Sequence, residues 1–325
     1  QTARGRILTS MEHRSYMARG IGASIVFSSL LFLCFSYPPI NAETTTEAFS
    51  RDLVIIDTVP HDSTSFTQGL EKRDGNLLES SGLYGHSRLS EINLQNGEII
   101  RQISFEDSIF AEGITVRNNS VIMLTWREGT AFEIDLEDFS VIGNYSYEGE
   151  GWGICYNGEY LVMSNGSSSL TFRDPDTFEI NHSLLVTFEE LGVTNLNELE
   201  CVGDTIYANV WMDDSILAIN SSSGKVKFIV RTSSVSESQG KNANEVLNGI
   251  AYDESAGGFW ITGKNWTEIY LVNFHESSNN TNSPDSSTTN SLILIVVGIC
   301  IVFFFCFRIL WRKDPETPNF KDHPQ

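Results

Sequence analysis

The segment EGITVRNNSVIMLTW, residues 112–126, shows the pattern that decides the fold. Its second half, Val121–Thr125, is a short run of aliphatic and β-branched residues that follows an Asn118-Asn119 turn. Similar runs, each after a turn rich in Gly, Asn or Asp, occur throughout residues 44–274, and no long helical period interrupts them. The sequence therefore predicts an all-β structure for this region.

The beginning of that segment recurs along the chain at intervals of roughly 40 to 50 residues. The related starts are Gln68-Gly69-Leu70, Glu112-Gly113-Ile114, Trp152-Gly153-Ile154, Glu198-Leu199-Glu200 and Asn248-Gly249-Ile250. A repeat of this length is typical of a β-propeller with one four-stranded blade per repeat. We therefore predict a five-bladed β-propeller over residues 43–274, in which the early strand Leu53–Thr58 completes the last blade. A β-sandwich with coincidental spacing is the less favoured alternative.

The N-terminal segment is similar to a secretory signal peptide. An apolar run, Ile21–Ser36, follows two arginines and precedes small and polar residues with a cleavage point at Ala42. An uncleaved anchor is the alternative. Because Met11 lies just before the basic residues, we expect residues 1–10 to lie outside the translated protein. Residues 1–42 are thus assigned to leader residues and a signal peptide.

A second apolar segment, residues 291–311, is long enough to cross a bilayer as a helix, for which about 20 residues are needed. Arg312 and Lys313 follow it directly and place the tail, residues 312–325, in the cytoplasm. The Ser/Thr/Asn-rich residues 275–290 are expected to form a flexible stalk. These features predict a single-pass type I membrane protein of the secretory pathway, in the Golgi, the endomembranes or the cell surface, with its β domain lumenal or extracellular.

Charge and composition narrow the class of partner. Lysine and arginine total 21 against 42 acidic residues, a formal net charge of −21. A surface this negative repels phosphate backbones, so we expect no nucleic-acid binding. Asn-x-Ser/Thr sequons are compatible with a secreted glycoprotein. They begin at Asn118, Asn144, Asn165, Asn181, Asn220, Asn265 and Asn279.

Two cysteines fall in the predicted β domain. Cys155 and Cys201 occupy matching positions in the third and fourth repeats. An oxidising lumen permits a disulfide between them, which requires Cα atoms within about 7 Å of each other. Because inner strands of adjacent blades diverge from the axis, the sequence slightly favours the alternative of two separate buried thiols.

Polar residues stand at the repeat starts, near conspicuous tryptophans. In a propeller the equivalent strand ends meet at one mouth of the central channel, so Gln68, Glu112, Trp152, Asn197 and Asn248 are expected to converge. The sequence lacks the motifs of several other common enzyme classes. The histidines show no metal-ligand spacing, no glycine-rich loop opens a helix, and no Gly-x-Ser-x-Gly elbow is present. The sequence therefore predicts no metal and no cofactor.

The motif series along the chain resembles that of plant and bacterial glutaminyl cyclases. It comprises Phe66-Thr67-Gln68-Gly69-Leu70, Glu112-Gly113-Ile114-Thr115, Leu124-Thr125-Trp126, Gly149-Glu150-Gly151-Trp152-Gly153, Leu196-Asn197-Glu198-Leu199-Glu200, Ala208-Asn209-Val210-Trp211, Leu247-Asn248-Gly249-Ile250-Ala251 and Thr262-Gly263-Lys264-Asn265-Trp266. The series covers residues 50–274 in order. The resemblance implies a five-bladed propeller that converts the N-terminal Gln of peptides or proteins to pyroglutamate, releases ammonia and requires no metal.

Matched by motif, the resemblance implies Glu112 as the catalytic proton shuttle. It also implies a substrate pocket formed by Gln68, Trp126, Trp152, Asn197, Trp211 and Lys264. The chain departs from the family pattern at Ala111, where glycine is usual, and at Thr267, where proline is common. The second change creates the sequon at Asn265, beside Lys264, and a glycan there would crowd the pocket.

The residue types suit this reaction. The α-amine of the substrate attacks its own γ-carboxamide, an orientation problem that a tight aromatic pocket solves. The amine loses a proton and the leaving group gains one, so a single carboxyl group can shuttle it. Near tryptophans the pKa of Glu112 is expected to rise toward neutrality. Lys264, Asn197 and Gln68 offer donors to the carbonyl oxygen that develops charge.

Other interpretations stay open. Glu112 can serve only to cap an inner strand, and we expect Asn248 and Glu198 to be structural because buried strand ends need partners. A propeller that has lost catalysis would act as an anchored binding module. A lactonase-like hydrolase would instead use Glu112 and Asn197 as metal ligands, which sensitivity to a chelator would reveal.

Overall fold

The structure is a computed structural model that describes residues 49–239 and 245–276. These residues belong to one compact unit. The predicted leader and signal peptide (1–42), the span (291–311) and the tail (312–325) lie outside the described residues, as does nearly all of the predicted stalk (275–290).

Strands dominate the part of the chain that the structure describes. Its one helix, α3 (Ser233–Gln239), has 7 residues, four of them serine. No helix within residues 49–239 and 245–276 is long and apolar enough to cross a membrane. The predicted fold class is therefore corrected: the described residues form an all-β fold without a transmembrane helix, and the predicted span, residues 291–311, lies outside them.

Three sheets are four-stranded antiparallel meanders in chain order. The first contains β2 (Thr67–Arg73), β3 (Asn76–Ser81), β4 (Arg88–Asn93) and β5 (Ile99–Ser104). The second contains β6 (Ala111–Arg117), β7 (Ser120–Thr125), β8 (Thr130–Asp135) and β9 (Val141–Ser146). The third contains β10 (Ile154–Tyr156), β11 (Leu161–Met163), β12 (Ser169–Arg173) and β13 (Ile180–Leu185).

The remaining long strands form one eight-stranded sheet. Its order is β16 (Leu196–Val202), β17 (Thr205–Val210), β18 (Ser215–Asn220), β19 (Val226–Arg231), β1 (Ser50–Pro60), β22 (Glu268–Glu276), β21 (Gly258–Gly263) and β20 (Leu247–Asp253). A small ribbon, β14 (Thr187–Phe188) with β15 (Leu191–Gly192), lies apart from it.

The prediction of five separate blades is corrected by the pairing of the early strand β1. As expected, β1 pairs with the last strand, β22, and this pairing is antiparallel. However, β1 is longer than predicted, and its first residues, Ser50–Asp52, pair in parallel with β19. These contacts use the backbone groups of an otherwise open sheet edge, and so they merge two four-stranded units into one sheet.

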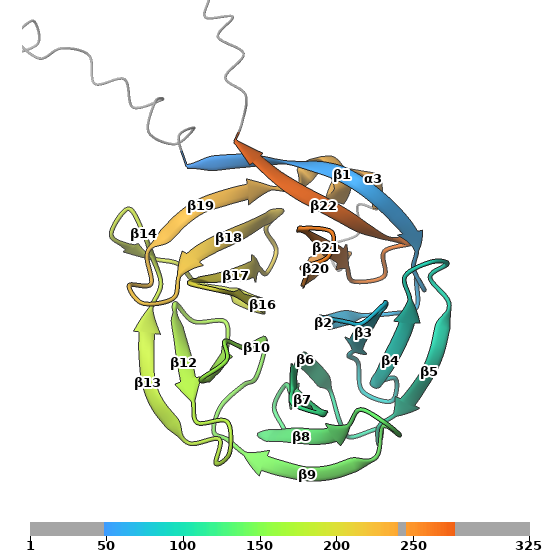
Figure 1. Ribbon diagram of the computed structural model, residues 1–325. Coiled ribbons are helices and arrows are strands. Elements are labelled where there is room, and N and C mark those ends of the chain that lie inside the picture. The colour runs from blue at the N-terminus through green and yellow to red at the C-terminus, as the bar shows by residue number, and fades with distance from the viewer. Residues whose placement is uncertain (1–48, 240–244, 277–325) are drawn as a thin grey trace, which may run out of the picture. The chain divides into compact units, whose positions relative to one another are not determined.

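The sheets lie around a common centre, and β2, β6, β10, β16 and β20 are the strands nearest to it (Figure 1). The glycine in the repeat start explains how these inner strands approach so closely. A Cβ on Gly113 would lie 2.7 Å from the Cα of Gly153, and a Cβ on Gly153 would lie 2.1 Å from the backbone oxygen of Asn197. A side chain at either glycine would therefore push neighbouring inner strands apart.

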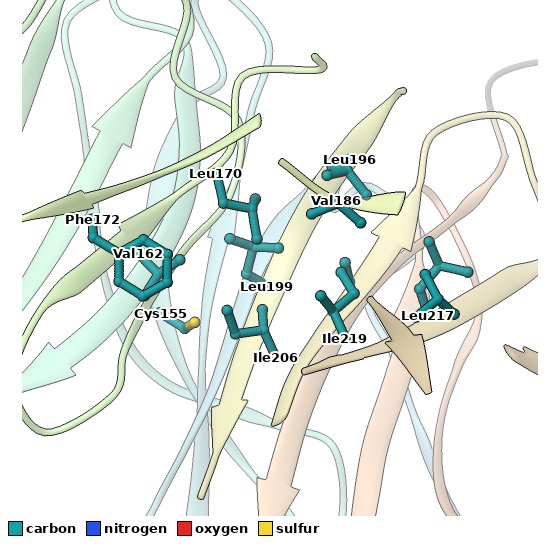
Figure 2. Packing of buried hydrophobic residues seen from close by; sticks show 12 residues of the cluster. Cys155, Val162, Leu170, Phe172, Val186, Leu196, Leu199, Ile206, Leu217 and Ile219 are labelled. Carbon is teal, nitrogen blue, oxygen red and sulfur yellow. The ribbon is translucent and has the colours of Figure 1, made fainter. Parts of the chain in front are cut away.

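Apolar side chains fill the space between neighbouring sheets. Val162 and Leu170 of the third sheet pack against Leu199 and Ile206 of the eight-stranded sheet, and all four are almost fully buried (Figure 2). Each such side chain contributes about 1.5–3 kcal/mol through burial. The β7 strand is buried along its whole length, which explains its continuous apolar sequence.

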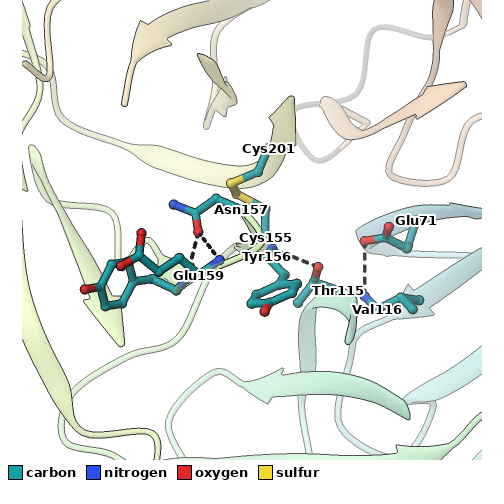
Figure 3. The surroundings of a disulfide bond; sticks show 9 residues. Glu71, Thr115, Val116, Cys155, Tyr156, Asn157, Glu159 and Cys201 are labelled. Atoms are coloured by element: carbon teal, nitrogen blue, oxygen red, sulfur yellow. Dashed lines mark hydrogen bonds between the residues drawn. A yellow bond between two sulfur atoms is a disulfide. The ribbon is translucent and has the colours of Figure 1, made fainter. Parts of the chain in front are cut away.

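A disulfide joins the same two sheets. Cys155 on β10 bonds to Cys201 on β16, with Cα atoms 5.5 Å apart (Figure 3). The inner strands thus stay close enough at this level for a bridge, against the divergence expected from the sequence. Of the two alternatives that the sequence left open, the structure has the disulfide.

Candidate active site

A cavity of about 240 Å³ opens where the inner strands begin and the second strands of the sheets end. All seven residues that the sequence assigned to the site line it: Gln68, Glu112, Trp126, Trp152, Asn197, Trp211 and Lys264. The structure therefore brings together residues separated by up to 196 positions in the sequence. The small volume of the cavity suits a single amino-acid residue better than a drug-sized ligand.

Irregular strand pairing turns the polar residues toward the centre. The register between the first two strands of a sheet shifts between Thr67 and Gly69, which places Gln68 in the irregular position. The β6–β7 register shifts in the same way around Glu112, and the β16–β17 register around Asn197. Such bulges re-aim a side chain away from its regular alternation. The repeated motif thus encodes both the bulge and the residue that it exposes to the cavity.

A chain of amide hydrogen bonds connects these residues across the floor of the cavity. Asn197 Nδ2 donates to Asn248 Oδ1 at 2.8 Å, and Asn248 Nδ2 donates to Gln68 Oε1 at 3.3 Å. Gln68 Nε2 then donates to Glu112 Oε1 at 3.0 Å. The chain holds the Glu112 carboxyl group in place and assigns a supporting role to Asn248, as the sequence predicted.

Glu198 is buried beneath the cavity and serves the backbone. Its carboxylate accepts the backbone N–H of Leu70 at 3.2 Å and of Ile250 at 2.9 Å. It therefore ties β16 to β2 and β20 across the centre, which agrees with the structural role expected from the sequence.

Glu112 and Lys264 form the ionisable pair of the cavity, and each is only 5% exposed. Burial raises the pKa of Glu112 well above its ordinary value, Lys264 opposes this rise, and the carboxylates of Glu150 and Glu128 add to it. Burial lowers the pKa of Lys264 to about 8, while Glu112 acts in the opposite direction. Enclosure in the cavity thus moves the pKa of the Glu112 carboxyl group up and that of the Lys264 ammonium group down, the directions that favour proton transfer by general acid–base chemistry.

Glu150 orients two of the tryptophans. The indole N–H groups of Trp126 and Trp152 both donate to its Oε2 atom at 3.0 Å. Its other oxygen accepts a bond from Arg127 Nε at 3.0 Å, and the Arg127 guanidinium stacks 3.7 Å above the Trp126 ring. The sequence assigned no role to Glu150, and the only signal was its place two residues before Trp152 in the Gly-Glu-Gly-Trp-Gly motif.

Phe66, Leu83, Phe110 and Val246 also line the cavity, and the sequence named none of them as site residues. The Phe110 ring lies 5.4 Å from that of Trp126, and the Lys264 ammonium lies 4.7 Å from the Phe66 ring centroid. Phe66 could have been noticed because it begins a family motif. Phe110 and Leu83 could not, because neither carries a motif.

The sequon at Asn265 lies beside the cavity. The Asn265 side chain is partly buried, and its Nδ2 atom, which would carry a glycan, donates to the backbone oxygen of Ser63 at 3.0 Å. The backbone N–H of Asn265 also donates to Ser65 at 2.7 Å. These bonds use Asn265 to fasten the loop that carries Lys264 to the chain before β2.

In residues 49–239 and 245–276, no three His, Cys, Asp or Glu side chains are grouped so that they could hold a metal ion. Asn197, a ligand in the hydrolase alternative, uses its Nδ2 atom to donate to Asn248 Oδ1.

Comparisons with known proteins agree with the resemblance seen in the sequence. The sequence model of the glutamine cyclotransferase family matches residues 28–274. A glutaminyl-peptide cyclotransferase of Arabidopsis thaliana is 30% identical over 265 residues, which cover 78% of this chain and 82% of that protein. The crystal structure of Myxococcus xanthus glutaminyl cyclase superposes with a TM-score of 0.66 at 33% identity, covering 70% of this chain and 97% of that chain. The chain therefore belongs to the glutamine cyclotransferase family.

Proposed function

We propose that the cavity binds the N-terminal glutaminyl residue of a peptide or protein and cyclises it to pyroglutamate, with Glu112 as the proton shuttle. One observation carries this proposal. Glu112 is a buried carboxyl group in the cavity, its pKa is raised, and Gln68 bonds only its Oε1 atom. Its Oε2 atom is then available to the substrate.

The reaction forms a bond between the α-nitrogen and the δ-carbon of the glutaminyl residue and breaks the bond from that carbon to the amide nitrogen. The Glu112 carboxylate accepts a proton from the α-amine as it attacks. The resulting carboxylic acid delivers the proton to the departing nitrogen, which leaves as ammonia. Atoms and charge balance, and Glu112 returns to its starting state without a second base.

Lys264 is the main donor to the oxygen that develops negative charge. Gln68 and Asn197 each already donate one amide bond within the floor of the cavity. The Lys264 Nζ atom has no hydrogen-bond partner among the described residues, although it lies over the Phe66 ring. A buried ammonium group without a partner has N–H donors free for an oxyanion. Its interaction with that oxyanion is stronger in the cavity than it would be in water.

The tryptophans hold the substrate in its bent form. Trp152 packs its ring edge-on against Trp211, with centroids 5.8 Å apart, and Glu150 holds both Trp126 and Trp152 by their N–H groups. Rigid walls of this kind bring the amine and the carboxamide into contact before reaction, which removes much of the entropic barrier.

The test is replacement of Glu112 by glutamine, which keeps the size of the side chain but cannot titrate. Mass spectrometry of a Gln-initiated peptide follows the loss of ammonia. We expect kcat to fall by on the order of 10² or more with KM largely kept. Glu137→Gln changes an exposed carboxylate in the β8–β9 turn that does not line the cavity and serves as the control, for which a change of a few-fold at most is expected. Near-normal turnover in Glu112→Gln would refute the assignment.

We also propose that the protein works in an oxidising compartment of the secretory pathway or outside the cell. The disulfide between Cys155 and Cys201 supports this, because such bonds are rare where glutathione keeps thiols reduced. Localisation of the tagged protein by microscopy and its sensitivity to endoglycosidase test the proposal, and a cytosolic, unglycosylated product would contradict it.

A further inference from the structure

The mouth of the cavity differs in chemistry from its floor. Gln68 and Glu112 on the floor are 3% and 5% exposed. Leu83 and Trp211 line the same cavity but are 37% and 42% exposed, so they stand where it opens to solvent. Next to Trp211 in the sequence, Met212 is 54% exposed. The large apolar side chains of Leu83 and Trp211 thus lie at the opening, and that of Met212 is exposed one residue further along the chain.

Two of these residues have an unusual backbone conformation. Leu83 has a φ of 85° and Met212 a φ of 67°. Positive φ is disfavoured for residues with a Cβ, and residues so strained gather at ligand-binding sites. Glycine would adopt either turn at lower cost. The chain therefore places a large apolar side chain at the opening despite backbone strain.

The surrounding turns do not depend on these side chains. The backbone oxygen of Leu83 accepts bonds from the N–H of His86 at 2.9 Å and the hydroxyl of Ser87 at 3.0 Å. The turn at Met212 is closed by the N–H of Asp213, which donates to the oxygen of Val210 at 3.0 Å. The two side chains are thus free to contact a ligand.

The two turns come from different sheets. Leu83 follows β3 of the first sheet, and Met212 follows β17 of the eight-stranded sheet. The first sheet and the β16–β19 part of the eight-stranded sheet stand on opposite sides of the common centre (Figure 1). Leu83 and Trp211 therefore line the cavity from two directions, and Met212 follows Trp211 in the chain.

A bound glutaminyl residue determines which part of the substrate peptide lies at the opening of the cavity. Its α-amine and side chain must lie in the cavity beside Glu112, so its carbonyl group and the rest of the peptide leave through the opening. We propose that Leu83, Trp211 and Met212 bind the side chain of the second substrate residue and select an apolar one, an inference that rests on the proposed function. Glu128, whose carboxylate accepts a bond from Tyr84 at 2.9 Å, adds negative charge beside Leu83 and disfavours an acidic second residue.

The experiment measures kcat/KM for peptides that differ only in their second residue: Gln-Leu, Gln-Phe, Gln-Ala and Gln-Glu. For the unmodified protein we expect Gln-Leu and Gln-Phe to exceed Gln-Ala by on the order of tenfold, and Gln-Glu to be the poorest. In Leu83→Gly and Met212→Gly the ratio of Gln-Leu to Gln-Ala should fall to about threefold, and in the double variant toward one. Glycine accepts positive φ, so these variants keep the fold.

Asp74→Gly is the matched control. Asp74 also has a positive φ, 49°, and is exposed in the β2–β3 turn, at the strand ends far from the cavity. It should leave the ratio unchanged. Equal kcat/KM for Gln-Leu and Gln-Ala in the unmodified protein, or a ratio that survives both glycine substitutions, would overturn the inference while the cyclase function stands. Absence of turnover with every peptide would overturn the proposed function itself.

Discussion

The disulfide between Cys155 and Cys201 allows a stability prediction of definite size. The two cysteines are 46 residues apart in the sequence. In the chain-entropy model, closing a loop of that length lowers the entropy of the unfolded chain enough to stabilise the fold by about 4 kcal/mol. The perturbation is the double variant Cys155→Ala and Cys201→Ala, which removes the bridge without leaving a free thiol in the folded domain.

The loss from packing adds little to this value. Cys155 is 1% exposed within the core between the third and eight-stranded sheets, but alanine keeps its Cβ and removes only the sulfur. We therefore expect the free energy of unfolding to fall by about 3–5 kcal/mol. With a urea dependence of about 3 kcal/mol per molar, the unfolding midpoint should fall by more than about 1 M.

The assay is urea unfolding followed by tryptophan fluorescence, with and without a reductant. The unmodified protein should lose stability when reduced, and the double variant should not respond to the reductant at all. Peptide mapping after thiol labelling of the unfolded, unreduced protein provides an independent check. Labelled Cys155 and Cys201, together with an unchanged midpoint in the double variant, would refute the reasoning.

The cavity provides two predictions that use the pH dependence of kcat/KM. Glu150→Gln keeps an oxygen acceptor for Trp126 and Trp152 but removes a negative charge that raises the pKa of Glu112, so the acidic limb of the profile should move to lower pH. Glu150→Ala should shift the limb in the same direction and also raise KM, because the indoles lose their acceptor; an unshifted limb in both variants would contradict this electrostatic role. Lys264→Met removes a positive charge that lowers the pKa of Glu112, so the acidic limb should move to higher pH, and kcat should fall by on the order of 10²–10³ through loss of the oxyanion donor. A Lys264→Met profile that moves the opposite way would show that the two groups do not interact as described.

Much of the candidate site could be predicted from the sequence because the motifs are local. A glycine after Gln68 or Glu112 permits close approach of the inner strands, and the accompanying bulge turns the polar side chain toward the centre. Since each repeat carries the glycine, the bulge or both, placing the repeats side by side gathers their polar residues. The raised pKa of Glu112 also follows from this arrangement, because any carboxyl group enclosed there is desolvated.

Other features depend on distances that no local pattern contains. The joining of two four-stranded units into one sheet depends on the first residues of β1 lying between β22 and β19, so that they pair with both strands. The hydrogen bonds of Glu150 to two indoles require three side chains to meet at one point in space.

The sequence by itself determined the all-β class, the family and the seven motif residues that line the cavity, because short repeated motifs encode turns, bulges and close strand contacts. Only the tertiary structure decided between a disulfide and free thiols. That choice depends on the distance of 5.5 Å between the Cα atoms of two cysteines that are 46 residues apart in the sequence. It likewise showed that a partly exposed Leu83 lines the cavity, since exposure and backbone strain depend on how the whole chain packs.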